Sequence, residues 1–319
     1  MVSHKIPHER NNYIRNYCQS CNEYKNGDCE ILRDFQNKSF HCLAQESIRK
    51  VAKNDKEEWL GESFLGIFKA DVDRLGEVFT TGLKENYSIS RYSTLSKNLN
   101  FFFTEYLYQL LNKNEFSSVY TVYSGGDDLF LLGPYTDILK FAKVFYLDFR
   151  EYTCHNSSLT FSAGFALLKP RQPIQVGGER AEEELENAKD KGRNSISLFG
   201  NSLKWEEYFE SLDIMSQFID FIDMGLPRAF LYRLLRYTRM HNESKTDPVQ
   251  LMYRSHFAYD KRRNIHDNPS LFKASGVKQQ EEKKKLDAFV SKLFHDSFNG
   301  REYVDFLEVP LQLAIYQSR

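Results

Sequence analysis

The chain has 319 residues, enough for about two domains with a sizeable core. Hydrophobic residues make up 41% and charged residues 27%, which excludes collagen-like, low-complexity and wholly disordered proteins. Lys and Arg number 43 against 44 Asp and Glu, so the net charge of -1 shows no global basic excess. No apolar run approaches the roughly 20 residues of a membrane span. A polar N-terminus and only five cysteines predict a reduced, cytoplasmic protein.

The sequence predicts three zones. Residues 1–60 are polar and hold four of the five cysteines, residues 61–203 alternate strand-like and helix-like patterns, and residues 204–319 are mostly helical. We expect the middle zone to form the main α+β domain and the last zone to form a helical domain.

The middle zone carries the most informative pattern. Residues 64–70 (FLGIFKA) form a short apolar run, typical of a buried strand. Apolar residues recur at helical spacing between 95 and 111. Two runs rich in β-branched and aromatic residues, 118–124 and 129–133, flank Gly-Gly-Asp-Asp and predict a hairpin. The remaining predicted elements are a helix at 138–149, a strand at 158–167, a helix at 179–191 and a strand at 195–199.

This order of elements is that of a ferredoxin-like palm, the fold of polymerases and nucleotide cyclases. A right-handed crossover makes the first two strands parallel and inserts the third between them, antiparallel to both. The end of the first strand and the hairpin turn then lie at one end of the sheet. We therefore expect Asp71 to lie beside Asp127 and Asp128, although more than fifty residues separate them in the sequence.

Three converging carboxylates repel one another unless cations lie among them. Such hard oxygen ligands suit Mg²⁺ or Mn²⁺, and a pair of these ions can activate a hydroxyl and neutralise a leaving pyrophosphate. Gly125 and Gly126, which lack Cβ atoms, would permit a tight turn and a close approach of a nucleotide to the backbone. The alternative is an ordinary hairpin, because glycine and aspartate are common in turns.

Two other polar residues allow two readings each. Asp73 either caps the following helix or ligates a metal. Lys189 lies where the helix at 179–191 ends, and either reaches toward a triphosphate or remains a solvated residue favoured by the helix dipole.

Several motifs together resemble the large, polymerase-like subunit of type III CRISPR effector complexes, in its Csm branch. The sequences YSGGDDLFLLG, FKADVDRLG and ENAKDKGRNSISLFG resemble its second palm domain. The C-terminal FLYRLLRY and VPLQLAIYQSR resemble its last, helical domain. The resemblance covers nearly the whole chain from the cysteine zone onward.

The resemblance implies an antiviral cyclase that converts ATP to cyclic oligoadenylate when the complex binds a matching transcript. Asp71, Asp127 and Asp128 would hold two Mg²⁺ or Mn²⁺ ions, Ser124 would touch an adenine edge, and Lys189 would contact the triphosphate. The implied partners are ATP, the small subunits, the guide-anchoring subunit and the crRNA–target RNA duplex.

The chain departs from the family pattern because neither a histidine–aspartate nuclease domain nor a first palm is visible. The family's pocket is shared by two palms, so we expect a C-terminal piece, a split subunit or a palm that dimerises. A second hypothesis is a catalytically silent half-site that binds ATP and supports assembly. A third is a GGDEF-type diguanylate cyclase, whose turn has Glu-Phe where this chain has Asp128 and Leu129.

The cysteine zone permits a zinc site. Cys18 and Cys21 have the spacing of a metal knuckle, Cys29 and Cys42 follow, and four thiolates suit tetrahedral Zn²⁺. The resemblance supports this reading, since the family often carries a zinc module before its second palm. The alternative is a set of thiols without metal.

Overall fold

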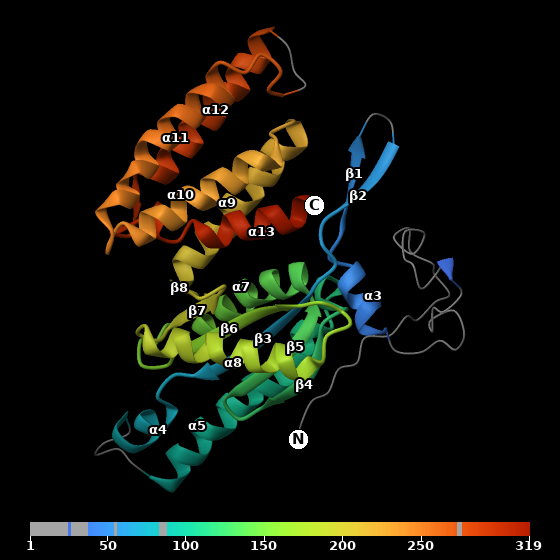
Figure 1. Ribbon diagram of the computed structural model, residues 1–319. Coiled ribbons are helices and arrows are strands. Elements are labelled where there is room, and N and C mark those ends of the chain that lie inside the picture. The colour runs from blue at the N-terminus through green and yellow to red at the C-terminus, as the bar shows by residue number, and fades with distance from the viewer. Residues whose placement is uncertain (1–24, 27–37, 54–55, 83–87, 273–275) are drawn as a thin grey trace. The chain divides into compact units, whose positions relative to one another are not determined.

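The structure is a computed structural model, in which the elements described here can be followed in Figure 1. The described residues are 25–26, 38–53, 56–82, 88–272 and 276–319. The chain divides into two compact units: residues 1–49 with 63–205, and residues 50–62 with 206–319. The boundary expected at 203/204 lies beside this division, whereas the expected segment 1–60 is divided between the two units.

The first unit is built on a six-stranded mixed sheet with the order β4-β5-β3-β6-β7-β8. Its strands are β3 (Leu65–Val72), β4 (Tyr120–Gly125), β5 (Asp128–Pro134), β6 (Phe161–Leu168), β7 (Ser195–Leu198) and β8 (Asn201–Lys204). β6 and β7 pair in parallel, and all other neighbours are antiparallel. β5 therefore lies between two parallel strands, β3 and β4, as the crossover rule predicts.

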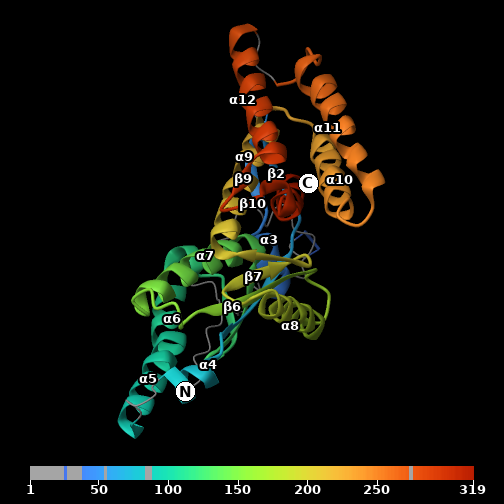
Figure 2. The same ribbon diagram turned by 90° about the vertical axis from the view of Figure 1, so that its left-hand side faces the viewer.

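Helices cover both faces of this sheet. They are α3 (Phe40–Gln45), α4 (Leu75–Glu77), α5 (Ile89–Phe101), α6 (Leu107–Leu111), α7 (Tyr135–Tyr152) and α8 (Ile174–Asp190), with the π-helical segments η2 (Val78–Gly82) and η4 (Phe102–Tyr106) and the 3₁₀ helix η5 (Asn114–Phe116). Figure 2 shows α7 and α8 on opposite sides of the sheet.

The central strand β3 is apolar along most of its length because both of its faces are covered. Neighbouring side chains of a strand point to opposite faces. Phe68 packs edge-on against Phe141 of α7, with 5.9 Å between ring centroids. Ile67 packs on the other side in a cluster with Leu43 of α3 and Ala181 of α8. This packing fixes β3, and with it the acidic end of the strand.

α8 lies unusually close to β6. A Cβ on Gly164 would come within 2.0 Å of the Ala181 carbonyl oxygen, so only glycine fits at this position. The approach holds the C-terminal turn of α8, which carries Lys189, against the sheet.

The second unit is mainly helical. Its elements are β1 (Arg49–Lys53), β2 (Lys56–Leu60), α9 (Trp205–Met224), α10 (Arg228–Glu243), η6 (Pro248–Met252), α11 (Tyr253–Lys261), η7 (Arg262–His266), α12 (Gly276–His295), β9 (Ser297–Phe298), β10 (Arg301–Glu302), η8 (Tyr303–Asp305) and α13 (Glu308–Ser318). An apolar stripe on α12 is buried, for example at Leu286, Val290 and Leu293. Within the described residues, every helix is too short or too polar to cross a bilayer.

Candidate metal centre and nucleotide site

Three carboxylates converge at one end of the sheet. Asp71, near the end of β3, pairs directly with Asp128, the first residue of β5. Directly paired residues project their side chains from the same face, and Asp127 follows from the hairpin loop. One oxygen from each carboxylate lies within 4.8 Å of the others. The topology thus brings together the acidic residues that we expected to meet.

The hairpin turn between β4 and β5 is a two-residue loop. Gly125 pairs with Asp128, which leaves Gly126 and Asp127 at the tip. Gly126 has a φ of 68°, and a positive φ at this first loop position is the pattern of a type II′ turn. A side chain at Gly126 would meet nothing within 4 Å, and one at Gly125 would meet only the Tyr123 hydroxyl at 3.7 Å. Space outside the turn is therefore open to a ligand.

Burial and the crowding of negative charge raise the pKa of two of these carboxyl groups. Partial desolvation, a hydrogen bond with Asp71 and the charges of Asp71 and Asp127 raise the pKa of Asp128 to about 6. Desolvation and the Asp71 charge also raise the pKa of Asp127. This donor set suits a divalent cation, which would relieve the repulsion and favour the ionised carboxylates.

Lys189 already partly neutralises this cluster. Its ammonium lies 2.9 Å from Asp71 Oδ2 and 3.1 Å from Glu186 Oε1. Burial disfavours the charged lysine, but its hydrogen bonds to Asp71 and Glu186 outweigh that effect and raise its pKa. Lys189 is therefore a cation at neutral pH, held at the edge of the acidic cluster rather than in solvent.

The hairpin is fastened to the helix beside it. Ser124 is fully buried and its hydroxyl donates to the Phe103 carbonyl in η4. The Gly126 N–H donates to Asn100 Oδ1 of α5, at 3.2 Å. In a π-helical turn the backbone hydrogen bonding is shifted by one residue, and such turns recur at functional sites. Contact of Ser124 with an adenine, as the resemblance implies, would require this buried hydroxyl to become accessible.

The contacts of Asp73 match neither of its two expected roles, helix capping and metal binding. The side chain is 4% exposed, and it gives no capping hydrogen bond to α4. Its carboxylate instead accepts hydrogen bonds from Thr160, Ser162 and the Asn194 backbone. Asp73 also lies outside the group of three carboxylates that could share a metal ion.

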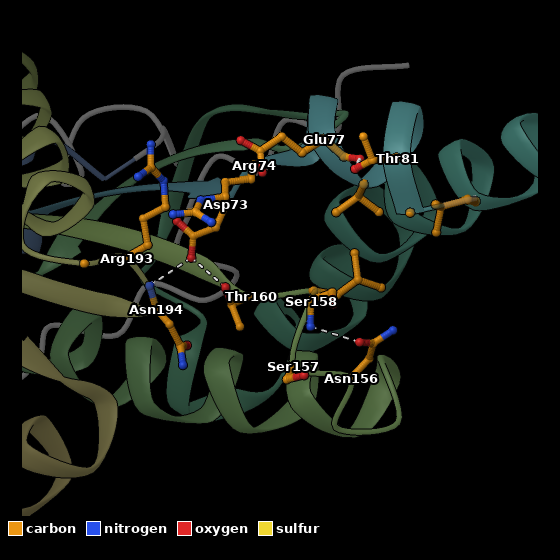
Figure 3. A pocket seen from close by; sticks show the side chains of 15 residues that line it. Asp73, Arg74, Glu77, Thr81, Asn156, Ser157, Ser158, Thr160, Arg193 and Asn194 are labelled. Carbon is orange, nitrogen blue, oxygen red and sulfur yellow. Dashed lines mark hydrogen bonds between the residues drawn. The ribbon is translucent and has the colours of Figure 1, made fainter. Parts of the chain in front are cut away.

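A polar cavity of about 650 Å³ opens beside the end of β3 (Figure 3). Asp73 and Arg74 line it together with Arg193, and the loop from Asn156 to Thr160 forms another wall. The sequence analysis missed both arginines. A signal was present for Arg193, which follows Gly192 directly at the end of a helix that carries Lys189.

The zinc prediction lies mostly outside the described residues. Cys18, Cys21 and Cys29 are not described, and Cys42 is a buried residue of α3. Among the described residues, the carboxylates of Asp71, Asp127 and Asp128 are the one group of three or more metal-binding side chains. The zinc site stays a prediction.

A sheet of this order, with acidic residues at the hairpin and at the end of the neighbouring strand, defines a palm domain. Residues 64–197 match the family model of the Cas10/Cmr2 second palm domain. The palm of this chain, residues 64–197, is therefore a domain of this second-palm type.

Curated relatives carry the name CRISPR system single-strand-specific deoxyribonuclease Cas10/Csm1 (subtype III-A). The Methanocaldococcus jannaschii protein is 36% identical over 171 residues, which are 47% of this chain and 21% of the relative. The Streptococcus thermophilus protein is 30% identical over 244 residues, 73% of this chain and 31% of the relative. The chain thus matches between a fifth and a third of the length of these relatives.

Solved structures share the fold. A crystal structure of a Csm1–Csm4 cassette in complex with cA3 matches the whole of this chain and 40% of its own matched chain. The TM-score is 0.65 and the sequence identity is 20%. The crystal structure of Csm1 in T. onnurineus covers 90% of this chain and 41% of its own, with a TM-score of 0.63 and 22% identity. The α+β palm followed by a helical unit is therefore confirmed.

Proposed function

We propose that this chain supplies the second palm of a type III CRISPR large subunit and joins ATP molecules into cyclic oligoadenylate. The observation that carries the proposal is the convergence of Asp71, Asp127 and Asp128 to within 4.8 Å in a Cas10/Cmr2 palm. The complexes of Csm1–Csm4 cassettes with cA3 and with ATP support the choice of substrate.

Asp71, Asp127 and Asp128 would hold two Mg²⁺ or Mn²⁺ ions. The ions would supply Lewis acidity at the reacting phosphate and lower the pKa of the attacking hydroxyl. The chain's own contribution is to place the three carboxylates on two paired strands and a two-residue turn, so that little rearrangement is needed when cations bind.

The nucleotide would lie over the open face of the hairpin tip. Gly125 needs no unusual φ and a side chain there would meet no clash, so neither backbone nor packing explains the glycine. A glycine within a strand often marks the close approach of a ligand. Lys189, Arg74 and Arg193 provide positive charge around the same end of β3, where a triphosphate would be bound.

In the proposed reaction, the 3′-oxygen of one ATP attacks the α-phosphorus of a second ATP and loses its proton to water. A new P–O ester bond forms, the bond between the α-phosphorus and the bridging oxygen breaks, and pyrophosphate leaves. Repetition and a final intramolecular attack close the ring. Lys189 would stabilise the growing negative charge on the leaving group.

The proposed activity needs a second palm. The chain matches 21% to 31% of the length of its relatives, and one acidic hairpin forms half of a pocket that would hold two ATP molecules. We propose that the other half comes from a first palm domain, and that a Csm4-like guide-anchoring subunit and small subunits complete the complex.

A basic segment of the second unit would contact the crRNA–target RNA duplex. Between residues 228 and 266, nine Lys and Arg stand against three Asp and Glu, although the whole chain is nearly neutral. Arg254 is exposed, and Tyr259 is 62% exposed on the same helix. Exposed basic and aromatic side chains together are typical of nucleic-acid surfaces.

The direct test combines the chain with a polypeptide that carries the first palm. The mixture is then incubated with ATP, Mn²⁺ and target RNA. Cyclic oligoadenylate is then measured by mass spectrometry. The double variant Asp127→Ala/Asp128→Ala is expected to lose the product completely while it still assembles. Asp213→Ala, an exposed change on α9, serves as the matched control and should keep full activity.

Other outcomes would favour the other hypotheses. Undiminished synthesis by the double variant contradicts the proposal. ATP binding without turnover in the complete complex favours a silent half-site. A cyclic dinucleotide formed from GTP would favour a diguanylate cyclase.

A further inference from the structure

Asp73 is the buried acid of this site whose purpose the proposed reaction leaves unexplained. It follows β3 directly and stands two residues from Asp71, yet it is 4% exposed and is not one of the three carboxylates that converge within 4.8 Å. Buried carboxylates are costly unless their oxygens are hydrogen-bonded, so its surroundings indicate its role.

Both oxygens of Asp73 are occupied by protein donors. Ser162 Oγ donates to Oδ1 at 2.7 Å, and Thr160 Oγ1 donates to Oδ2 at 2.7 Å. The third donor is the backbone N–H of Asn194, 2.9 Å from Oδ2, and Figure 3 shows this bond beside the one from Thr160. Asp73 thus ties the end of β3 to β6 and to the loop between α8 and β7.

That loop has an unfavourable backbone conformation. Three successive residues have positive φ: Gly192 at 110°, Arg193 at 57° and Asn194 at 46°. Non-glycine residues rarely adopt this region, and two in a row persist only when the surroundings hold them. Contacts that hold the loop include the hydrogen bond from the Asn194 N–H to the Asp73 carboxylate and the one from the Lys204 ammonium to the Arg193 carbonyl, at 2.8 Å. The Tyr146 hydroxyl also donates to Asn194 Oδ1, at 3.3 Å.

The loop carries positive charge to the nucleotide site. Its backbone N–H groups close the C-terminal turn of α8, since Arg193 N donates to the Ala188 carbonyl and Gly192 N to the Lys189 carbonyl. Lys189 in that turn contacts Asp71, and Arg193 lines the cavity. A displacement of the loop would therefore move both cations.

We propose that Asp73 is a positioning residue: it holds the strained loop 192–194 so that Lys189 and Arg193 are fixed where a nucleoside triphosphate binds. Asp73 does this through hydrogen bonds and does not ligate the metal ions. The proposal rests on the proposed function, because it assigns the loop's cations to the same nucleotide.

Two substitutions separate positioning from metal binding. In Asp73→Asn the amide oxygen can still accept from Asn194 N–H and Thr160, while the amide nitrogen donates to the Ser162 hydroxyl. Asp73→Ala loses all three bonds. Ser162→Ala is the matched control, because it removes one bond to Asp73 but leaves the bond to the loop.

Three quantities are measured on the full chain: the affinity for ATP in Mg²⁺ by calorimetry, the affinity for Mn²⁺ alone by electron paramagnetic resonance, and amide hydrogen exchange at Asn194. We expect Asp73→Ala to weaken ATP binding by about tenfold, to speed exchange at Asn194 and to leave Mn²⁺ affinity unchanged. Asp73→Asn and Ser162→Ala should keep the ATP affinity of the wild type.

Two results would overturn the proposal. If Asp73→Asn loses Mn²⁺ affinity as severely as Asp71→Asn, Asp73 is a metal ligand. If Asp73→Ala folds, as judged by its melting curve, and binds ATP like the wild type, the loop needs no such support.

Should the wild type itself fail to bind ATP, the proposed function fails, and fast exchange at Asn194 in Asp73→Ala would still report that Asp73 holds the loop. Should Asp73→Ala not fold, the Asp73→Asn measurement alone decides between the two roles.

Discussion

Asp128 is held in its ionised form at a cost when no cation is bound. Its pKa is raised to about 6, so the folded protein binds a proton there more tightly than the unfolded chain does. Where the folded state binds more protons, stability falls as the pH rises. Between about pH 4 and pH 6 the ionisation of Asp128 therefore destabilises the metal-free protein, and above that range the cost is constant.

This linkage predicts the behaviour of Asp128→Asn. Without divalent ions, the variant should melt at a higher temperature than the wild type at pH 7.5, because the repulsion is gone. The difference should shrink toward pH 4, where the wild-type carboxyl is protonated. Calorimetry across this pH range, in chelator, measures it. Equal melting temperatures at pH 7.5 would show that the three carboxylates do not repel one another as described.

Addition of a divalent metal should reverse the order of the melting temperatures of the wild type and Asp128→Asn. Millimolar Mn²⁺ is expected to raise the melting temperature of the wild type, because an ion that binds only the folded state stabilises it. Asp128→Asn should respond much less, since it has lost one ligand. A similar increase for both would contradict the assignment of Asp128 as a ligand.

The contact of Lys189 with the triphosphate can be tested by measuring KM and kcat for ATP separately. Lys189→Ala removes the cation that contacts Asp71 at 2.9 Å. We expect the KM for ATP to rise by about tenfold or more, corresponding to about 1.4 kcal/mol or more, while the fold is kept. Lys191→Ala, two residues further on, is the control and should behave as the wild type. A KM unchanged in Lys189→Ala would contradict its contact with the triphosphate.

At the level of elements, the position of α8 depends on one glycine of the strand beneath it. Gly164→Ala would place a Cβ 2.0 Å from the Ala181 carbonyl oxygen, which is backbone and cannot give way. Overpacking of this kind costs about 1–3 kcal/mol or more. We expect a lower free energy of unfolding in urea, together with weaker ATP binding because Lys189 moves with the helix.

Gly178→Ala, a substitution on α8 itself, is the control for Gly164→Ala. Its Cβ would meet the Phe130 ring at 3.4 Å, an ordinary contact, and alanine is favoured over glycine inside a helix by about 1 kcal/mol. This variant should be as stable as the wild type or more so. Destabilisation of both variants alike would show that the closeness of α8 to β6 is not the cause.

The sequence predicted the elements that are locally encoded. The apolar run of β3 and the hairpin around Gly126 are short-range signals, and the crossover rule then places Asp71 beside the turn. The sequence pattern predicted that α8 begins at residue 179, whereas the helix begins at Ile174. Gly177 and Gly178 disfavour a helix by propensity, yet a Cβ at Gly177 would crowd Ile67 at 3.0 Å, so tertiary packing requires the glycine.

The role of Asp73 could not be predicted because its partners are distant in sequence. Thr160 and Asn194 lie 87 and 121 residues further along the chain. An acid after a strand has the same local pattern whether it binds metal, caps a helix or holds a loop. The burial of Ser124 was missed for a similar reason, since its partner is a carbonyl in a π-helical turn that helical periodicity does not reveal.

For the whole molecule, one acidic hairpin implies dependence on a partner. We expect the chain alone to bind ATP but to form no cyclic product, and a first-palm polypeptide to restore synthesis. If the chain instead acts as a homodimer, the rate per molecule should rise with its concentration. Product measured over a hundredfold range of chain concentration, with and without the partner, distinguishes these cases, and synthesis independent of both would contradict the half-site.

The π-helical turn η4 has a consequence for the neighbouring hairpin. It contains one residue more than a regular helix would need between α5 and α6. Because of that residue, the Leu107 N–H donates to the Phe102 carbonyl, while the Phe103 carbonyl accepts from Ser124. Deletion of a single residue from 102–106 would restore ordinary α-helical winding and leave α5 and α6 in nearly the same phase. A helical N–H would then compete with Ser124 for its carbonyl, and the hairpin would lose an anchor although the protein kept its helical content.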